Sequence, residues 1–122
     1  MLAYILSSQM IIDALKSAAS RGIKIRMSLD YNMSCERVYY KDIKRVEIRF
    51  SPPPMVQHNK IMIFDDETVL TGSANFTNAV DSRNYENMIL IRNAPEIMAE
   101  YIKRFEFYWN NSRDTESPPD LF

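Results

Sequence analysis

Four polar side chains in the middle of the chain have types and spacings that suit the cleavage of a phosphate ester. His58 and Lys60 are two residues apart, and so are Ser73 and Asn75. Residues two apart on a strand leave the same face, and a hairpin that turns near Asp66 would bring both pairs together. Lys60 would supply positive charge, while Ser73 and Asn75 would donate hydrogen bonds to nonbridging oxygens. His58 is the member of this set that can act as a nucleophile near neutral pH.

Two carboxylates, Glu86 and Asp65, belong to the candidate site, and the counts of histidine and cysteine exclude several other kinds of site. Glu86 follows on the next predicted strand and can accept a proton from the second ring nitrogen of His58, which would fix its tautomer. Asp65 falls at the corner of the predicted hairpin, where an Asp more often holds backbone amides than does chemistry. The chain has one histidine and one cysteine, Cys35, which exclude a multi-histidine metal site, a Cys-rich zinc cluster and an intrachain disulfide.

The segment before this set predicts a β-α-β unit. Residues 1–6 read as a strand, Ser8 as the cap of a helix with Gly22 just past its end, and residues 23–29 as a strand with one buried face. Such a unit implies neighbouring parallel strands. Because the first strand starts at residue 1, we expect it to be truncated.

The rest of the chain, from residue 30 onward, predicts a mixed sheet covered by helices. We expect a strand over residues 46–50, a hairpin over 56–72 and a strand over 88–91 that is apolar enough for the middle of a sheet. Short helices are expected near residues 36–44 and 76–82. A longer helix opens at Pro95, with an apolar face formed by Ile97, Met98, Tyr101, Ile102, Phe105 and Trp109. The predicted fold class is α/β, with a mixed central sheet flanked by helices, as one domain over residues 1–113 and a flexible tail over 114–122.

Composition narrows the function classes. The chain has 122 residues, 46% of them hydrophobic, and a formal charge of −1, which exclude a disordered chain and a strongly cationic nucleic-acid coat. No apolar run approaches the about 20 residues that span a bilayer, so stable membrane insertion is not expected. Residues 21–49 carry eight basic and four acidic side chains, which form either a solvated surface or a positive rim that attracts phosphates.

The full pattern resembles the signature of the phospholipase D superfamily. It is His58-x-Lys60-x4-Asp65-x6-Gly72-Ser73-x-Asn75, with every signature position filled. Segments on both sides are similar to small bacterial nucleases of that superfamily, so the resemblance covers most of residues 3–113. These segments are 4–30, the run Asn84-x-Glu86-Asn87 and the last helix, ending in Trp109.

This resemblance implies an α/β/α sandwich and a mechanism without metal or cofactor. In the family, one histidine attacks phosphorus to form a phosphohistidine, and a histidine from a second copy of the motif protonates the leaving oxygen. A chain with one histidine must then act as a homodimer that shares one active site. The resemblance gives His58, Lys60, Ser73, Asn75 and Glu86 catalytic or phosphate-binding roles. It gives Asp65 and Gly72 structural roles in the motif.

The substrate stays open between several readings. An endonuclease acting on DNA or RNA leads, because the shortest members with one motif are mainly nucleases. A phospholipase D or cardiolipin hydrolase is the alternative. A non-catalytic phosphate-binding or dimerisation module, or a fragment of a larger restriction or repair enzyme, is an alternative of another class. One free cysteine favours the cytoplasm, with export open if a leader has been removed.

Two further enzymatic readings have less support in the sequence. A carboxylate metal nuclease would draw on Asp30, Asp65, Asp66 and Glu86, but no pattern predicts that they converge. A hydrolase triad of Ser73, His58 and Glu86 lacks a GxSxG elbow.

Overall fold

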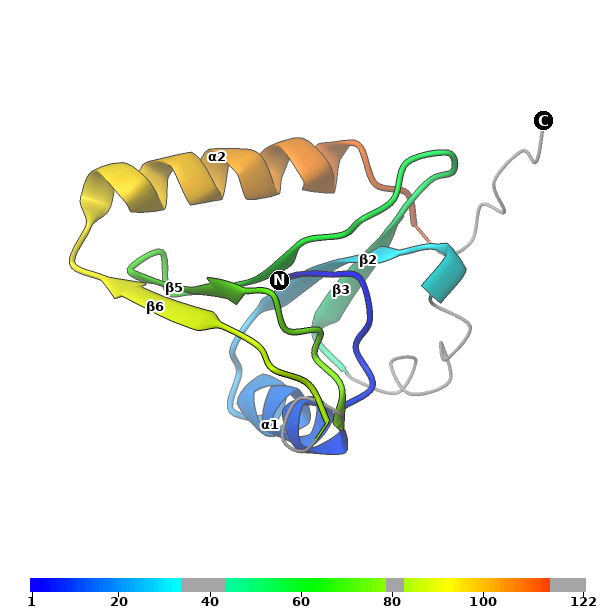
Figure 1. The fold of residues 1–122 in the computed structure, drawn as a ribbon, viewed down its shortest axis with the longest axis horizontal. Coiled ribbons are helices and arrows are strands. Elements are labelled where there is room, and N and C mark those ends of the chain that lie inside the picture. Colours follow the sequence, from blue (N-terminus) through cyan, green and yellow to red (C-terminus); the bar gives the residue numbers. More distant parts are fainter. Residues whose placement is uncertain (34–43, 79–82, 115–122) are drawn as a thin grey trace.

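A computed structural model describes residues 1–33, 44–78 and 83–114, in which a six-stranded mixed sheet lies between two helices (Figure 1). The strand order is β3-β2-β1-β4-β5-β6; β1, β2 and β3 are parallel, and β4, β5 and β6 join by antiparallel pairing. The elements are β1 (Leu2–Ala3), α1 (Gln9–Ser20), β2 (Ile25–Asp30), β3 (Val46–Ser51), β4 (Lys60–Phe64), β5 (Thr68–Gly72), β6 (Met88–Arg92) and α2 (Pro95–Asn110). The predicted α/β class, with helices on both faces, is confirmed.

Helix α1 covers one face of the sheet. Ile12 and Ala19, two turns apart, are buried in a core that includes residues of β2 and β3. The helix ends where predicted: Gly22 has φ 91°, and the amide of Ile23 donates to the carbonyl of Ala18. Ser8 precedes the helix as predicted, but its side chain makes no capping hydrogen bond.

Helix α2 covers the opposite face. Met98, Phe105 and Trp109 are buried against the sheet, with Val69 of β5 among their partners. Ile97 was expected on the same apolar face, but it is 46% exposed, because it lies in the first turn and its side chain leaves the helix away from that core.

The β4–β5 hairpin turns on two aspartates. Asp65 and Asp66 have φ 54° and 56°, and the amide of Glu67 donates to the carbonyl of Phe64 at 3.0 Å. Two successive positive φ values match the right-handed twist of the strands, and Asp tolerates them better than most residues. The predicted hairpin is confirmed.

Two expectations about strands are wrong. Strand β6 is an edge strand rather than a central one, and its Met88, Ile89 and Leu90 are 41%, 56% and 50% exposed. The apolar run therefore marks a surface, not the middle of the sheet. In β2 both faces are covered, so Ser28 and Asp30 are buried as well as the apolar Met27 and Leu29.

The first strand is shorter than predicted. Pairing in β1 is confined to Leu2 and Ala3, and Leu6 forms an isolated bridge with Phe76. The expected short helix near 36–44, apart from residue 44, and Cys35 lie outside the described residues, as do residues 79–82 and most of the expected tail.

Candidate active site

The predicted site residues other than Asp65 lie at one end of the sheet. Strands β1 and β2 end there, and Lys60 begins β4 beside Ala3 of β1. The β4–β5 hairpin returns the chain to the same end, where Gly72 closes β5. The segments just beyond these strand ends carry the other predicted residues, so the hairpin does collect them as the sequence predicted.

Lys60 holds His58 through three contacts. Its Nζ lies 3.0 Å from Nδ1 and 3.3 Å from Nε2 of the imidazole, and it donates a 2.7 Å hydrogen bond to the His58 carbonyl. Lys60 is only 8% exposed, whereas His58 is exposed. Burial lowers the pKa of the Lys60 ammonium, and the negative charge of Glu86 opposes that shift. The site therefore places a buried positive charge beside an accessible imidazole.

The reason for this proximity differs from the predicted one. His58 was expected on a strand with Lys60, but β4 begins only at Lys60. The lysine side chain instead reaches back to both the backbone and the ring of His58. Contact, rather than strand alternation, brings the two groups together.

The residues on either side of His58 are anchored to β2. The amide of Gln57 donates to Oδ2 of Asp30 at 2.9 Å, and both residues are buried. The Gln57 side chain donates to Ser28 Oγ at 3.4 Å and accepts from Asn59 Nδ2 at 2.7 Å. These bonds fix the backbone that carries the imidazole. Sequence reasoning considered Asp30 only as a metal ligand and missed this anchoring.

Ser73 and Glu86 are in contact just beyond the paired ends of β5 and β6. The Ser73 hydroxyl donates to Glu86 Oε2 and accepts from the amide of Asn87 at 3.1 Å. Asn84 Nδ2 donates to the other Glu86 oxygen at 3.2 Å. Within the described residues, the Glu86 carboxylate thus binds Ser73 and Asn84 rather than His58. A Ser-His-Glu triad would require the Ser73 hydroxyl to contact the imidazole of His58. It contacts the Glu86 carboxylate instead.

Gly72 permits this arrangement through a close approach of two backbones. A Cβ atom at Gly72 would lie 2.1 Å from the carbonyl oxygen of Asn87 and 2.9 Å from Cα of Met88. The next amide, of Ser73, donates to that same Asn87 carbonyl at 3.0 Å. A glycine is required here for space.

Asn75 and Tyr4 complete the surroundings of the site. The Oδ1 atom of Asn75 is buried, with no hydrogen-bond partner in the described part of the chain. The Tyr4 ring lies 4.6 Å from the His58 ring, centroid to centroid, and 5.5 Å from Lys60 Nζ. Tyr4 fell inside the segment that resembles the bacterial nucleases, but no spacing rule singled it out.

The carboxylates expected of a metal nuclease do not converge. Asp65 lies at the far end of β4 from His58, in the hairpin turn. Asp30 accepts three backbone amides, including those of Asn32 and Met33. In residues 1–33, 44–78 and 83–114, no three or more His, Cys, Asp or Glu residues form a group that could hold a metal ion.

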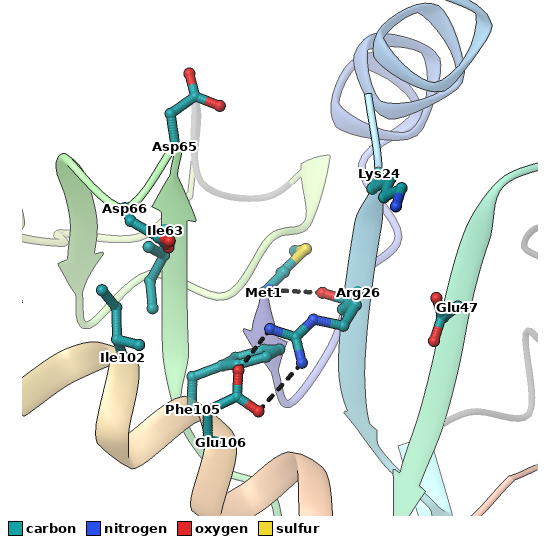
Figure 2. Close-up of a pocket in the computed structure, with 10 residues that line it drawn as sticks. All are labelled: Met1, Lys24, Arg26, Glu47, Ile63, Asp65, Asp66, Ile102, Phe105 and Glu106. Carbon is teal, nitrogen blue, oxygen red and sulfur yellow. Dashed lines mark hydrogen bonds and ion pairs between the residues drawn. The ribbon is translucent and has the colours of Figure 1, made fainter. Parts of the chain in front are cut away.

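Part of the basic segment faces α2 instead of the site. A cavity of about 280 Å³ lies between the sheet and α2, and in it Arg26 forms an ion pair with Glu106 at 2.6 Å. Figure 2 shows the residues that line it. Arg49 donates to the carbonyl of Trp109 at 3.0 Å and lies over its ring. Lys24 lines the same cavity as Arg26. A positive rim around the site cannot include the two arginines, because packing on α2 occupies them.

Comparison with known proteins identifies the family. A family model described as cardiolipin synthase, PLD-like domain, matches residues 1–109. The crystal structure of Nuc, a phospholipase D family member from Salmonella typhimurium, superposes with a TM-score of 0.84 at 30% identity, covering 94% of this chain and 79% of that one. The chain therefore belongs to the phospholipase D superfamily.

Curated relatives carry names of lipid-cleaving enzymes. A phospholipase D from Rickettsia conorii is 34% identical over 108 residues, which cover 86% of this chain and 54% of that protein. A human mitochondrial cardiolipin hydrolase is 27% identical over 119 residues, covering 93% of this chain and 47% of that protein. The chain thus spans about half the length of the curated relatives it matches.

Proposed function

We propose that this chain is a metal-independent phosphodiesterase that cleaves the backbone of DNA or RNA as a homodimer, with His58 as the nucleophile. The observation that carries the proposal is the contact between Lys60 Nζ and His58 Nδ1 at 3.0 Å. When an imidazole attacks phosphorus, the nonbridging oxygens come to lie close to the ring. A buried ammonium at that position stabilises the charge that gathers on them in the transition state.

The reaction proceeds in two displacements at phosphorus. In the first, an imidazole nitrogen of His58 bonds to phosphorus, the ester P–O bond breaks, and His58 of the partner subunit donates a proton to the leaving oxygen. In the second, the partner subunit's His58 takes a proton from water, whose oxygen bonds to phosphorus as the P–N bond breaks. Both imidazoles return to their starting states, and no metal or cofactor takes part.

Three further side chains bind the phosphate in this scheme. Lys60 and Asn75 donate hydrogen bonds to the nonbridging oxygens, and the Ser73 hydroxyl joins them when its single proton turns from Glu86 to the phosphate. Glu86 accepts from Ser73, which supports a role in orienting that hydroxyl. Its predicted role in orienting His58 stays a prediction.

One observation supports the homodimer. The exposed apolar residues of β6 begin two residues after Glu86, so an apolar surface adjoins the site. Burying such a surface between two copies would bring two sites together.

The openness of the site supports a polymeric substrate. His58 and Ser73 are both exposed, so an extended phosphodiester backbone can lie across them, and sequence-independent binding needs only phosphate contacts. Without the two arginines that pack on α2, such binding depends more on Lys60 and on the doubled site of a dimer.

A lipid phosphodiester is the second candidate, and one feature of the site favours it. Met55 and Val56 are 67% and 54% exposed just before Gln57 and His58. Such side chains could insert into a lipid surface, and the two curated relatives are named for lipid cleavage. No helix in the described ranges has the length and apolarity to cross a bilayer.

The proposal is tested by one substrate panel. Single- and double-stranded DNA, RNA and cardiolipin vesicles are incubated with the protein, with and without EDTA, beside His58→Asn checked for folding by circular dichroism. We expect nucleic-acid cleavage that EDTA leaves intact and that His58→Asn abolishes. Hydrolysis by folded His58→Asn would contradict the assignment of His58 as the nucleophile, and loss of activity in EDTA would contradict metal independence. Cleavage of cardiolipin alone would show that the substrate is a lipid.

A further inference from the structure

The ring of Tyr4 lies close to both His58 and Lys60. Its centroid is 4.6 Å from the His58 centroid, with the planes tilted by 54°, and Lys60 Nζ lies 5.5 Å from the Tyr4 centroid. Lys60 Nζ itself is 3.0 Å from His58 Nδ1. The three side chains therefore form one cluster, which we call the Tyr4 cluster.

The backbone around Tyr4 is held from two sides. Tyr4 follows β1 directly, and the preceding Ala3 pairs with Lys60 of β4. The carbonyl of Ile5 accepts the amide of Phe76 at 3.1 Å, and the Phe76 carbonyl accepts the amide of Ser7 at 2.9 Å. Tyr4 thus sits on a segment fixed between the strand that begins with Lys60 and the chain that follows Asn75.

His58 needs such a support because it is exposed and precedes its strand. A side chain there would otherwise sample several rotamers, and each substrate encounter would have to select the reactive one. A ring packed against the imidazole restricts that choice. The face of an aromatic ring also attracts cations, so Tyr4 stabilises the ammonium of Lys60, whose Nζ lies over the ring.

We propose that Tyr4 is a positioning residue that holds the His58 imidazole and the Lys60 ammonium in the geometry for attack on phosphorus. This inference rests on the proposed function for its catalytic consequence. Its structural content, the ring contact, stands without any substrate. The ring performs this role, whereas the Tyr4 hydroxyl has no part in it.

Nuclear magnetic resonance tests the contact directly, because His58 is the single histidine of the chain. With ¹³C-labelled histidine, the imidazole signals belong to His58 alone. We expect a nuclear Overhauser effect between the ring protons of Tyr4 and His58 in the unaltered protein. Tyr4→Leu should move the His58 signals because the ring current is lost, Tyr4→Phe should move them little, and Phe107→Leu should leave them in place. Phe107 is a matched control, since it is 55% exposed on α2.

Steady-state kinetics test whether the Tyr4 contact affects catalysis. We expect Tyr4→Leu to lower kcat about tenfold with little change in KM, and Tyr4→Phe to restore kcat to within about twofold. Tyr4→Phe as slow as Tyr4→Leu would overturn the role of the ring, and so would an equal loss through KM alone. Absence of the Overhauser effect, or unmoved His58 signals in Tyr4→Leu, would overturn the contact itself. If the protein cleaves no phosphodiester, the proposed function fails while the resonance data still decide this inference.

Discussion

The ammonium of Lys60 lies within 3.3 Å of both ring nitrogens of His58 and donates to the His58 carbonyl. Lys60 is almost fully buried, while the imidazole that it contacts is exposed. A positive charge on a buried side chain therefore lies in direct contact with an imidazole at the surface. In the proposed reaction, a phosphate oxygen would take over part of the ammonium's contact with the ring, so the lysine would serve the transition state better than the resting site.

Lys60→Met tests whether this charge is kept for function at a cost in stability. We expect hydrolysis to fall by about 100-fold or more, because a transition-state charge loses its partner. We also expect the free energy of unfolding to rise by about 1 kcal/mol, because a buried ammonium is replaced by an apolar chain of similar length. Lys103→Met, on the exposed side of α2, is the matched control and should change neither quantity appreciably.

The pH dependence of that stability difference has a definite sign. The pKa of Lys60 is lower in the folded state than its ordinary value of 10.5, so the unfolded state binds more protons between the two values. The unaltered protein therefore gains stability as the pH rises through this window. The advantage of Lys60→Met over it should shrink between neutral pH and about pH 10.5. Denaturant titrations at several pH values check this, and an advantage that grows with pH would contradict it.

Gly72→Ala tests the close approach of β5 and β6. The added Cβ would meet the backbone of Asn87 and Met88, which can yield only if the strands separate locally. We expect a loss of roughly 1–3 kcal/mol in the free energy of unfolding and reduced activity per folded molecule, because Ser73 and Glu86 lie across that gap. Gly22→Ala is the matched control. Its strain arises from a φ of 91°, since the added Cβ would meet only Arg45 Nη1 at an ordinary contact distance of 3.5 Å, so stability should fall while activity per folded molecule stays the same. Equal loss of activity in both variants would remove the link between Gly72 and the site.

Local patterns sufficed for much of the fold. The β-α-β unit, the Asp65–Asp66 turn and the helix opening at Pro95 each depend on residues close in sequence, and all three are present. The place of a strand within the sheet is not a local property. The apolar run of β6 reads equally as a central strand or as an edge that another surface covers, and here it is the edge.

For the site, sequence spacing supplied the residues but not all of their contacts. The hairpin carried Ser73 to the end of the sheet where Lys60 lies, as predicted. The contacts of Tyr4 with His58 and of Asp30 with Gln57 depend on the pairing of β1 with β2 and β4. Such registers join segments far apart in the chain, and periodicity in one segment does not encode them.

Subunit mixing tests most directly whether two His58 side chains share one phosphodiester. Unaltered chains and His58→Asn chains are unfolded together in equal amounts, refolded so that subunits pair at random, and assayed on the substrate that the panel identifies. If each site needs an imidazole from both subunits, only dimers of two unaltered chains are active, and we expect about a quarter of the activity of an all-unaltered sample at the same total concentration. Activity of about one half would mean that each chain works alone, and it would contradict the shared site.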